Sequence, residues 1–234
     1  MDSIRIPRPS PWSMLREARL LPDLAAGLSA LPALARAPRA SGEPVLVLPG
    51  YGAGDSSTAL LRAFLRGLGY RAQGWGLGRN GGDVRKLLPR VLARTERLFA
   101  ASERAVRLVG WSLGGVLARE AARDQPRLVE RVVTLGSPVV GGPKYTAVGE
   151  LYRRRGVDLD AIEREIAARN AARPIRVPIH AIYSRRDGVV AWQACVDRAS
   201  PDVEHVEVPS THSGLGFDAR VLALVADRLA RQRR

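Results

Sequence analysis

The sequence predicts an α/β protein with a mostly parallel sheet of about six strands flanked by helices. Six short apolar runs recur along the chain, and helical patterns lie between most of them. Strands that alternate with helices pair in parallel, because each helix returns the chain to the same end of the sheet. The expected strands are residues 45–49, 70–75, 105–110, 131–136, 177–183 and 203–208.

Length and composition fit one large core. The chain has 234 residues and is 46% hydrophobic, with no evident internal repeat. A chain of this size can bury a single core. We expect an N-terminal helical extension over residues 1–43 and a body over residues 44–234, with an insertion at about 139–174 between two strands.

The extension is a helix-like stretch that Pro22 and Pro32 interrupt. Its leucines approximate a helical stripe. A helix packed on the body is one interpretation, and a helix that binds a membrane surface or a partner is the other. The stretch does not resemble a signal peptide, and no run of about 18 apolar residues predicts a spanning helix. The leucines are Leu20, Leu21, Leu24, Leu28, Leu31 and Leu34.

The strongest motif is the run Gly110-Trp-Ser-Leu-Gly114, which follows an expected strand and precedes a helical pattern. Strand, G-x-S-x-G and helix in this order are typical of a nucleophile elbow, in which a tight turn exposes the serine. Small residues at 110 and 114 leave room for the turn. Ser112 is therefore the candidate nucleophile. The alternative is an ordinary glycine-rich turn that carries a serine without a catalytic role.

A catalytic serine needs a base to take its proton, and only three histidines are present. His180 and His205 lie inside strand patterns. His212 follows the last expected strand, in the loop that precedes the final helix. Because ligands and catalytic groups collect at the carboxyl ends of parallel strands, we expect His212 to be the base.

The expected carboxylate is Asp187, immediately beyond the strand at 177–183. Gly188 allows a sharp turn after it. An Asp here also suits a helix cap. The chain order Ser112, Asp187, His212 favours the catalytic role, because it is the order of one known class of triad.

An oxyanion hole needs two backbone N–H groups aimed at the attacked carbonyl oxygen. Leu113 supplies one, because it follows the nucleophile. Tyr51 is placed to supply the other, in the glycine-rich loop after the first expected strand. The same glycines also suit a plain turn.

With these motifs, the chain resembles α/β-hydrolase fold serine hydrolases of the bacterial esterase and lipase type over about residues 44–231. The resemblance rests on Leu48-Pro-Gly-Tyr-Gly52, Gly110–Gly114, Val133–Pro138, Asp187–Val190 and Thr211–Gly214. It implies an α/β-hydrolase fold with a small helical cap. The family often has His-Gly in the oxyanion loop, where this chain has Pro49-Gly50, and a histidine where this chain has Trp111.

The insertion suggests two short amphipathic helices that form a cap over Ser112. Such a cap supplies an apolar acyl pocket, and a purely structural excursion is the alternative. The expected pocket residues are Trp111, Tyr145, Leu151, Tyr152 and Val189.

The formal net charge of +14 raises the question of nucleic acid. Nearly all basic residues are arginines spread along the chain, with Lys86 and Lys144 as the exceptions, so we expect no nucleic-acid footprint. Attraction to anionic lipid stays open. The single cysteine, Cys195, excludes an intrachain disulfide. No spacing predicts a metal site, and no cofactor motif occurs, so we expect neither.

The residues together predict a serine hydrolase that cleaves carboxylic esters, with a small-molecule or lipid acyl ester as substrate. A thioesterase or an acyltransferase would use the same groups. The opposing class is a non-catalytic binding protein on the same scaffold. We expect a cytoplasmic protein, with peripheral membrane contact through the extension or the basic surface as the alternative, and the sequence does not predict the oligomeric state.

Overall fold

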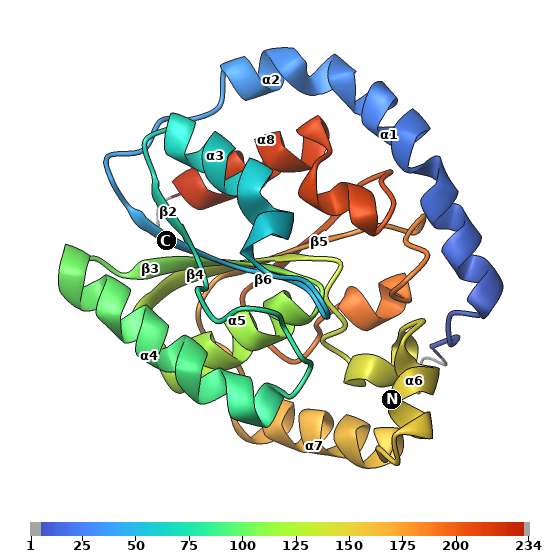
Figure 1. The fold of residues 1–234 in the computed structure, drawn as a ribbon. Coiled ribbons are helices and arrows are strands. Elements are labelled where there is room, and N and C mark those ends of the chain that lie inside the picture. Colours follow the sequence, from blue (N-terminus) through green and yellow to red (C-terminus); the bar gives the residue numbers. More distant parts are fainter. Residues whose placement is uncertain (1–5, 232–234) are drawn as a thin grey trace.

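A six-stranded sheet with the order β2-β1-β3-β4-β5-β6 forms the centre of the computed structural model (Figure 1). The structure describes residues 6–231; residues 1–5, which begin the expected extension, and 232–234 lie outside the described residues. Every ladder is parallel, which confirms the α/β fold class. The strands are β1 (Pro44–Leu48), β2 (Arg71–Gly74), β3 (Val106–Trp111), β4 (Val129–Leu135), β5 (Ile179–Tyr183) and β6 (Val203–Glu207).

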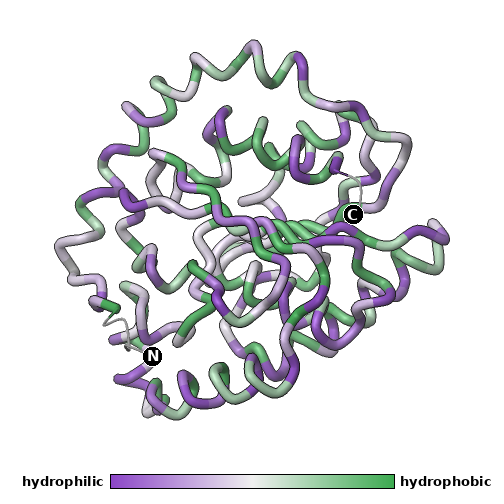
Figure 2. The backbone as a smooth tube through the Cα atoms, turned by 180° about the vertical axis from the view of Figure 1, so that it is seen from behind, coloured by the Kyte–Doolittle hydropathy of each residue, from purple (hydrophilic) through white to green (hydrophobic). Residues whose placement is uncertain are grey.

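Helices cover both faces of this sheet. Alternate residues of β1 pack on opposite sides, with Val45 and Val47 in one apolar cluster and Leu46 and Leu48 in the other. This two-residue period is what a strand buried on both faces requires. In Figure 2 the central strands are correspondingly hydrophobic. One face carries α3 (Ala59–Gly67) and α8 (Ala219–Ala230), and the other carries α4 (Val84–Ser102) and α5 (Leu113–Asp124).

Residues 6–43, which we call the N-terminal arm, lie outside this layered body and run along α8 (Figure 1). The leucines of the arm do not face the body as one stripe: Leu21, Leu28 and Leu31 are exposed. The arm alternates between 3-10 and α geometry, and a 3-10 turn holds fewer residues, so a single helical stripe cannot persist. Its elements are η1 (Pro11–Arg19), α1 (Leu20–Gly27), η2 (Leu28–Ala30) and α2 (Leu31–Ala35).

The insertion between β4 and β5 is tied to the chain that follows β5. Thr146 forms an antiparallel bridge with Val190, and the Ala147 amide donates to the Val189 carbonyl over 2.7 Å. The segment around Asp187 is thus fixed by the insertion. The elements of the insertion are η4 (Gly142–Tyr145), α6 (Gly149–Arg154) and α7 (Leu159–Ala172).

Short 3-10 segments complete the connections: η3 (Asp55–Thr58), η5 (Trp192–Cys195) and η6 (Ser213–Gly216). Within residues 6–231, no helix has the length and apolar character needed to cross a membrane.

A buried ion pair anchors helix α5, which begins directly after Ser112. The guanidinium of Arg119 lies 2.7 Å from the Asp197 carboxylate, and both side chains are almost fully buried. Asp197 also accepts hydrogen bonds from the amides of Ala199 and Ser200. Burial lowers the pKa of Arg119, opposed by the Asp197 charge.

We expect Asp197→Ala to lower the free energy of unfolding by about 3–5 kcal/mol, because it leaves the Arg119 charge buried without its partner. Urea unfolding measures the loss. Glu150→Ala is the control: Glu150 pairs with Arg154 at an exposed position, so the change is about 0–1 kcal/mol. A loss at Asp197 as small as that of the control would contradict the expectation.

Candidate active site

Ser112 lies at the turn between β3 and α5, in a backbone conformation that non-glycine residues rarely adopt. Its φ is 53° and its ψ is −122°. The amide of Ser112 donates to the Leu135 carbonyl at the end of β4 over 2.7 Å, which holds the turn in place. A Cβ at Gly110 or Gly114 would collide with neighbouring backbone, so the turn needs glycine at both positions. Such strain concentrates at functional sites.

His212 and Asp187 meet at the same edge of the sheet, after β6 and β5. His212 Nδ1 lies 2.7 Å from Asp187 Oδ2, and both side chains are buried. The other carboxylate oxygen of Asp187 accepts from the amides of Val189 and Val190, over 2.8 and 2.7 Å. A carboxylate used as an acceptor places the ring proton on Nδ1 and leaves Nε2 free to act as a base.

The pKa of His212 is raised. Burial opposes the charged imidazolium, but the charge and hydrogen bond of Asp187, with a further contribution from the Glu17 charge, outweigh that cost. An imidazolium favoured in this way suits a base that must hold a proton during the reaction.

Gly136, at the end of β4, packs directly against this pair. Its φ is +54°, and a Cβ there would lie 2.7 Å from Leu215 Cδ1, 3.0 Å from Asp187 Oδ2 and 3.1 Å from His212 Nδ1. A side chain at this position would therefore have to displace Leu215 and press on the Asp187–His212 pair, which favours glycine.

The elbow and the His212 loop are joined by Trp111. Its indole Nε1 donates to the His212 carbonyl over 3.2 Å, and the two ring centroids are 6.2 Å apart. Phe217 packs edge-on against the same indole. Within the described residues, no hydrogen bond joins Ser112 Oγ to the His212 ring; catalytic contacts of this kind often tighten only when substrate binds.

The loop after β1 lies beside Ser112. A Cβ on Gly50 would be 3.2 Å from the Ser112 Cβ, so the backbone next to Tyr51 reaches the nucleophile. Asn80, fully buried, holds this loop. Its side-chain Nδ2 donates to the Pro49 carbonyl over 2.9 Å, and its backbone carbonyl accepts from the Gly52 amide over 2.8 Å. Leu113 begins α5, where the first amides lack intrahelical acceptors.

The expected pocket residues lie in three places. Trp111 packs under the His212 loop. Tyr145 and Val189 join a small apolar cluster around Val190 beside the Asp187 segment. Tyr152, on α6, packs against Tyr51 with ring centroids 5.7 Å apart, and burial raises its pKa to about 12. Leu151 is 39% exposed. A common pocket formed by these five residues remains a prediction.

A cleft of about 370 Å³ opens between the N-terminal arm and the segment after β5. Arg8, Arg16 and Arg185 line it together with one side of Asp187. Ser112 is not among its lining residues, so we do not assign the acyl group to this cleft.

The two other histidines lie inside strands, His180 in β5 and His205 in β6. His180 is buried in β5, and its Nδ1 lies 3.0 Å from a Glu204 carboxylate oxygen. Burial lowers its pKa. His205 lies within β6, as the alternation predicted.

Sequence reasoning missed three residues that hold the site: Gly136, Asn80 and Glu17. Glu17 lies on the arm, and its carboxylate accepts from three amides: Gly188 over 3.0 Å, His212 over 2.9 Å and Ser213 over 2.8 Å. The glycine-rich run around Asn80 is a local sign of a functional loop, whereas nothing near Glu17 in the sequence marks it.

No protein-family model matches this chain, and no curated protein sequence matches it either. Solved structures do match. A lipase from Bacillus licheniformis aligns with a TM-score of 0.61 at 15% identity, covering 82% of this chain and 93% of its own. Mouse alpha/beta hydrolase domain-containing protein 10 aligns with a TM-score of 0.56 at 19% identity, covering 81% of this chain and 90% of its own.

The thioesterase domain of the curacin biosynthetic pathway aligns with a TM-score of 0.55 at 17% identity, covering 81% of this chain and 93% of its own. Identities this low carry information about the fold alone. With the parallel sheet and the arrangement of its connections, they show that this chain has the α/β-hydrolase fold.

Proposed function

We propose that this protein is a serine hydrolase that cleaves carboxylic esters through an acyl-enzyme on Ser112. The observation that carries the proposal is the 2.7 Å hydrogen bond between His212 Nδ1 and Asp187 Oδ2, at the sheet edge where Ser112 sits on a strained turn. A buried Asp–His pair with a free Nε2 beside such a serine is the arrangement that activates a hydroxyl.

In the first half of the reaction, Ser112 Oγ attacks the acyl carbon while His212 Nε2 takes the hydroxyl proton. The amides of Tyr51 and Leu113 stabilise the negative charge that forms on the carbonyl oxygen. The bond to the alcohol oxygen then breaks, and the imidazolium donates its proton to the leaving alcohol. Asp187 stabilises the imidazolium throughout.

In the second half, His212 removes a proton from a water molecule, which attacks the acyl-enzyme. Collapse of this second intermediate releases the carboxylic acid and returns the proton to Ser112. The chemistry of the residues is the same when the acyl group arrives on a thiol or leaves on a second alcohol, so thioester cleavage and acyl transfer are the alternatives within this class. A matched fold titled as a thioesterase domain supports keeping the thioester alternative.

We expect a fluorophosphonate probe to label Ser112, located by mass spectrometry, and labelling to disappear in Ser112→Ala and His212→Ala. Without the nucleophile or its base, ester turnover falls by about 10⁴-fold or more. Ser56→Ala, which alters an exposed serine, is the control and keeps both labelling and turnover.

A folded wild-type sample that the probe does not label would refute the proposal and favour a non-catalytic binding protein. Esters and thioesters of matched acyl length, assayed with and without added alcohol, separate hydrolysis of esters from hydrolysis of thioesters and from acyl transfer.

Gly136→Ala tests the packing beneath the Asp187–His212 pair. We expect kcat/KM for esters to fall by about tenfold and by no more than about 100-fold, because a Cβ presses on both members of the pair. Gly76→Ala is the matched control: Gly76 also has a positive φ, +69°, but a Cβ there meets nothing within 4 Å. In both variants the free energy of unfolding falls by about 1 kcal/mol, because alanine is strained at a positive φ. Equal kcat/KM in the two variants would exclude a specific effect on the pair.

A further inference from the structure

We propose that Glu17 is a positioning residue of the active site, which fastens the Asp187 loop to the His212 loop. This inference rests on the proposed function. Glu17 Oε1 accepts from the amides of Gly188 and His212, and Oε2 accepts from the amide of Ser213. One carboxylate thus binds the residue after the acid, the base itself and the residue after the base.

The Gly188 amide lies in a loop, and the amides of His212 and Ser213 lie at the N-terminal end of η6, where no residue of the helix supplies an acceptor. A buried amide without an acceptor costs about 1–3 kcal/mol. The hydrogen bonds to Glu17 therefore stabilise each loop and hold the two loops at a fixed distance from each other. That spacing is the one at which Asp187 Oδ2 and His212 Nδ1 lie 2.7 Å apart.

The arm around Glu17 is itself fastened to the same region. Ser13 Oγ donates to the Gly188 carbonyl over 2.8 Å, and the buried Asp23 carboxylate lies 3.1 Å from the Arg186 guanidinium. Glu17 lies between these two attachments, so its carboxylate has little freedom to leave the amides.

The charge of Glu17 acts on the His212 ring as well. Burial opposes ionisation of Glu17, but the hydrogen bonds from Ser213, Gly188 and His212 outweigh it and lower its pKa. The carboxylate is therefore negative at neutral pH. Asp187 and Glu17 are the charges that act on the His212 ring, and the neighbouring Trp111 ring, 6.2 Å away between centroids, is uncharged. The guanidinium of Arg16, on the arm beside Glu17, donates to the Arg185 carbonyl.

Glu17→Gln keeps the size of the side chain and removes its charge. We expect kcat for esters to fall about tenfold, which is 1.4 kcal/mol of transition-state stabilisation, with KM little changed. Removing a negative charge lowers the pKa of His212. Since the reaction needs neutral His212, the acidic limb of kcat/KM moves to lower pH.

The pKa of His212 is also read by NMR titration of its ring, with the signal assigned by its absence from His212→Ala. Glu130→Gln is the matched control: it also turns a partly buried glutamate into glutamine and removes an ion pair, the one with Arg107 over 3.0 Å, but it leaves Glu17 and its attachments intact. We expect it to lower the melting temperature while leaving the acidic limb and the His212 titration unchanged.

Two results together would overturn the inference and leave Glu17 a scaffold residue. In Glu17→Gln the pKa of His212 would be unchanged, and activity would fall only in proportion to the fraction of enzyme that the fluorophosphonate probe labels. The NMR readout needs no turnover. A wild-type protein that is inactive while its His212 pKa falls in Glu17→Gln would refute the proposed function and support the role of Glu17.

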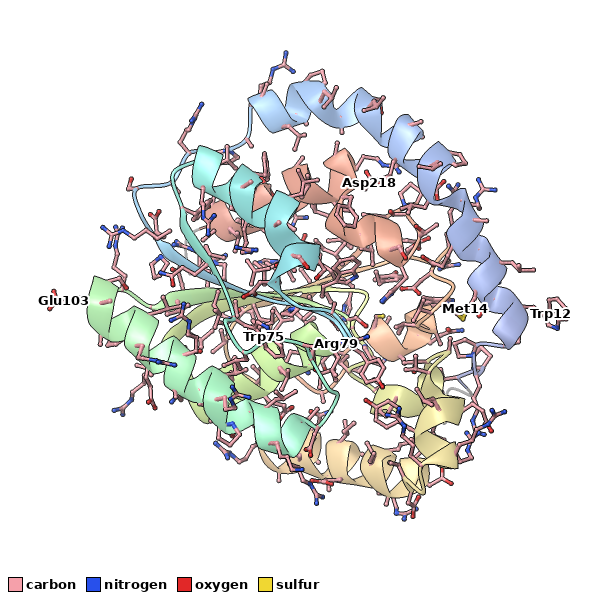
Figure 3. The ribbon with its side chains drawn as sticks, viewed as in Figure 1. Trp12, Met14, Trp75, Arg79, Glu103 and Asp218 are labelled. Carbon is pink, nitrogen blue, oxygen red and sulfur yellow. The ribbon has the colours of Figure 1, made fainter. Side chains whose placement is uncertain are left out.

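A different observation concerns the outer face of the arm, which is apolar and basic. Trp12 is 77% exposed and projects away from the body (Figure 3), and Leu21 is 76% exposed. The only acidic residues between positions 6 and 40 are Glu17 and Asp23, and both bind groups of the body. Leu15, Leu28 and Leu31 are exposed as well, and Arg19, Arg36 and Arg39 are exposed arginines of the arm that do not line the cleft beside Asp187.

We infer that this outer face binds an anionic lipid surface. Apolar side chains that enter the boundary between head groups and acyl chains gain from burial, and each nearby arginine adds about 1 kcal/mol on an anionic surface. A second copy of the chain fits less well, because two molecules that each carry a formal charge of +14 repel each other.

Sedimentation with phosphatidylcholine vesicles, with and without phosphatidylglycerol, tests this inference. We expect binding to vesicles that contain phosphatidylglycerol, weakened by salt, and at least about tenfold weaker for the double variant Trp12→Ser, Leu15→Ser. Leu60→Ser is the control, since Leu60 is a 48% exposed leucine on α3.

Equal partitioning of the double variant and the wild type would overturn the inference. So would a wild-type dimer in light scattering that the double variant converts to a monomer, because the face would then be an interface between two copies.

Discussion

The carboxylate of Asp187 is the point on which the arrangement of the candidate site depends. One oxygen accepts from two amides of its own loop, and the other accepts from His212. The bonds to the first oxygen orient the carboxylate independently of His212. The second oxygen therefore points toward the position of the His212 ring. The sequence allowed two roles for this residue, a helix cap and the partner of a base. Asp187 Oδ1 caps a turn at Val189 and Val190, since the next helical segment begins only at Trp192, and Oδ2 bonds to the His212 ring.

Three separate parts of the chain converge on the Asp187 loop. The insertion forms the bridge between Thr146 and Val190, the N-terminal arm bonds to Gly188, and the His212 loop bonds to the carboxylate. Such convergence supplies the preorganisation that a base and its orienting group need, since an error of a fraction of an ångström weakens catalysis. The N-terminal arm is therefore adjacent to the site, although it lies far from it in the sequence.

Most of the fold was predictable because its signals are local. Each observed strand agrees with an expected apolar run within two residues at either end, since a buried parallel strand needs such a run and turn residues bound it. Ser112 follows β3 directly, Asp187 and His212 lie in the loops after β5 and β6, and parallel pairing brings those strand ends to one edge. Local patterns therefore placed three distant residues on one side of the sheet.

Contacts between distant segments carried no local signal. Glu17 is 195 residues from His212, and a glutamate among arginines and leucines reads as an ordinary solvated charge. Asn80 had a weak sign in its glycine-rich surroundings, yet its hydrogen bond to Pro49 follows only from how two loops meet. The leucines of the N-terminal arm formed a stripe only on the assumption of one continuous helix, and the 3-10 segments remove that regularity.

The same constraint explains why η1 presents Ser13 and Glu17 to the body and Trp12 and Leu15 to the outside. The surface beneath it consists of loops whose amides need acceptors, and covering them with leucine would leave those amides unpaired. Glu17 and Ser13 therefore face inward, and Trp12 and Leu15 are displaced outward. Further along, α2 lies over α8, and there the apolar side chain of Leu34 faces inward and packs on the apolar cluster. The outward position of Trp12 and Leu15 is thus a consequence of how the arm holds the Asp187 and His212 loops.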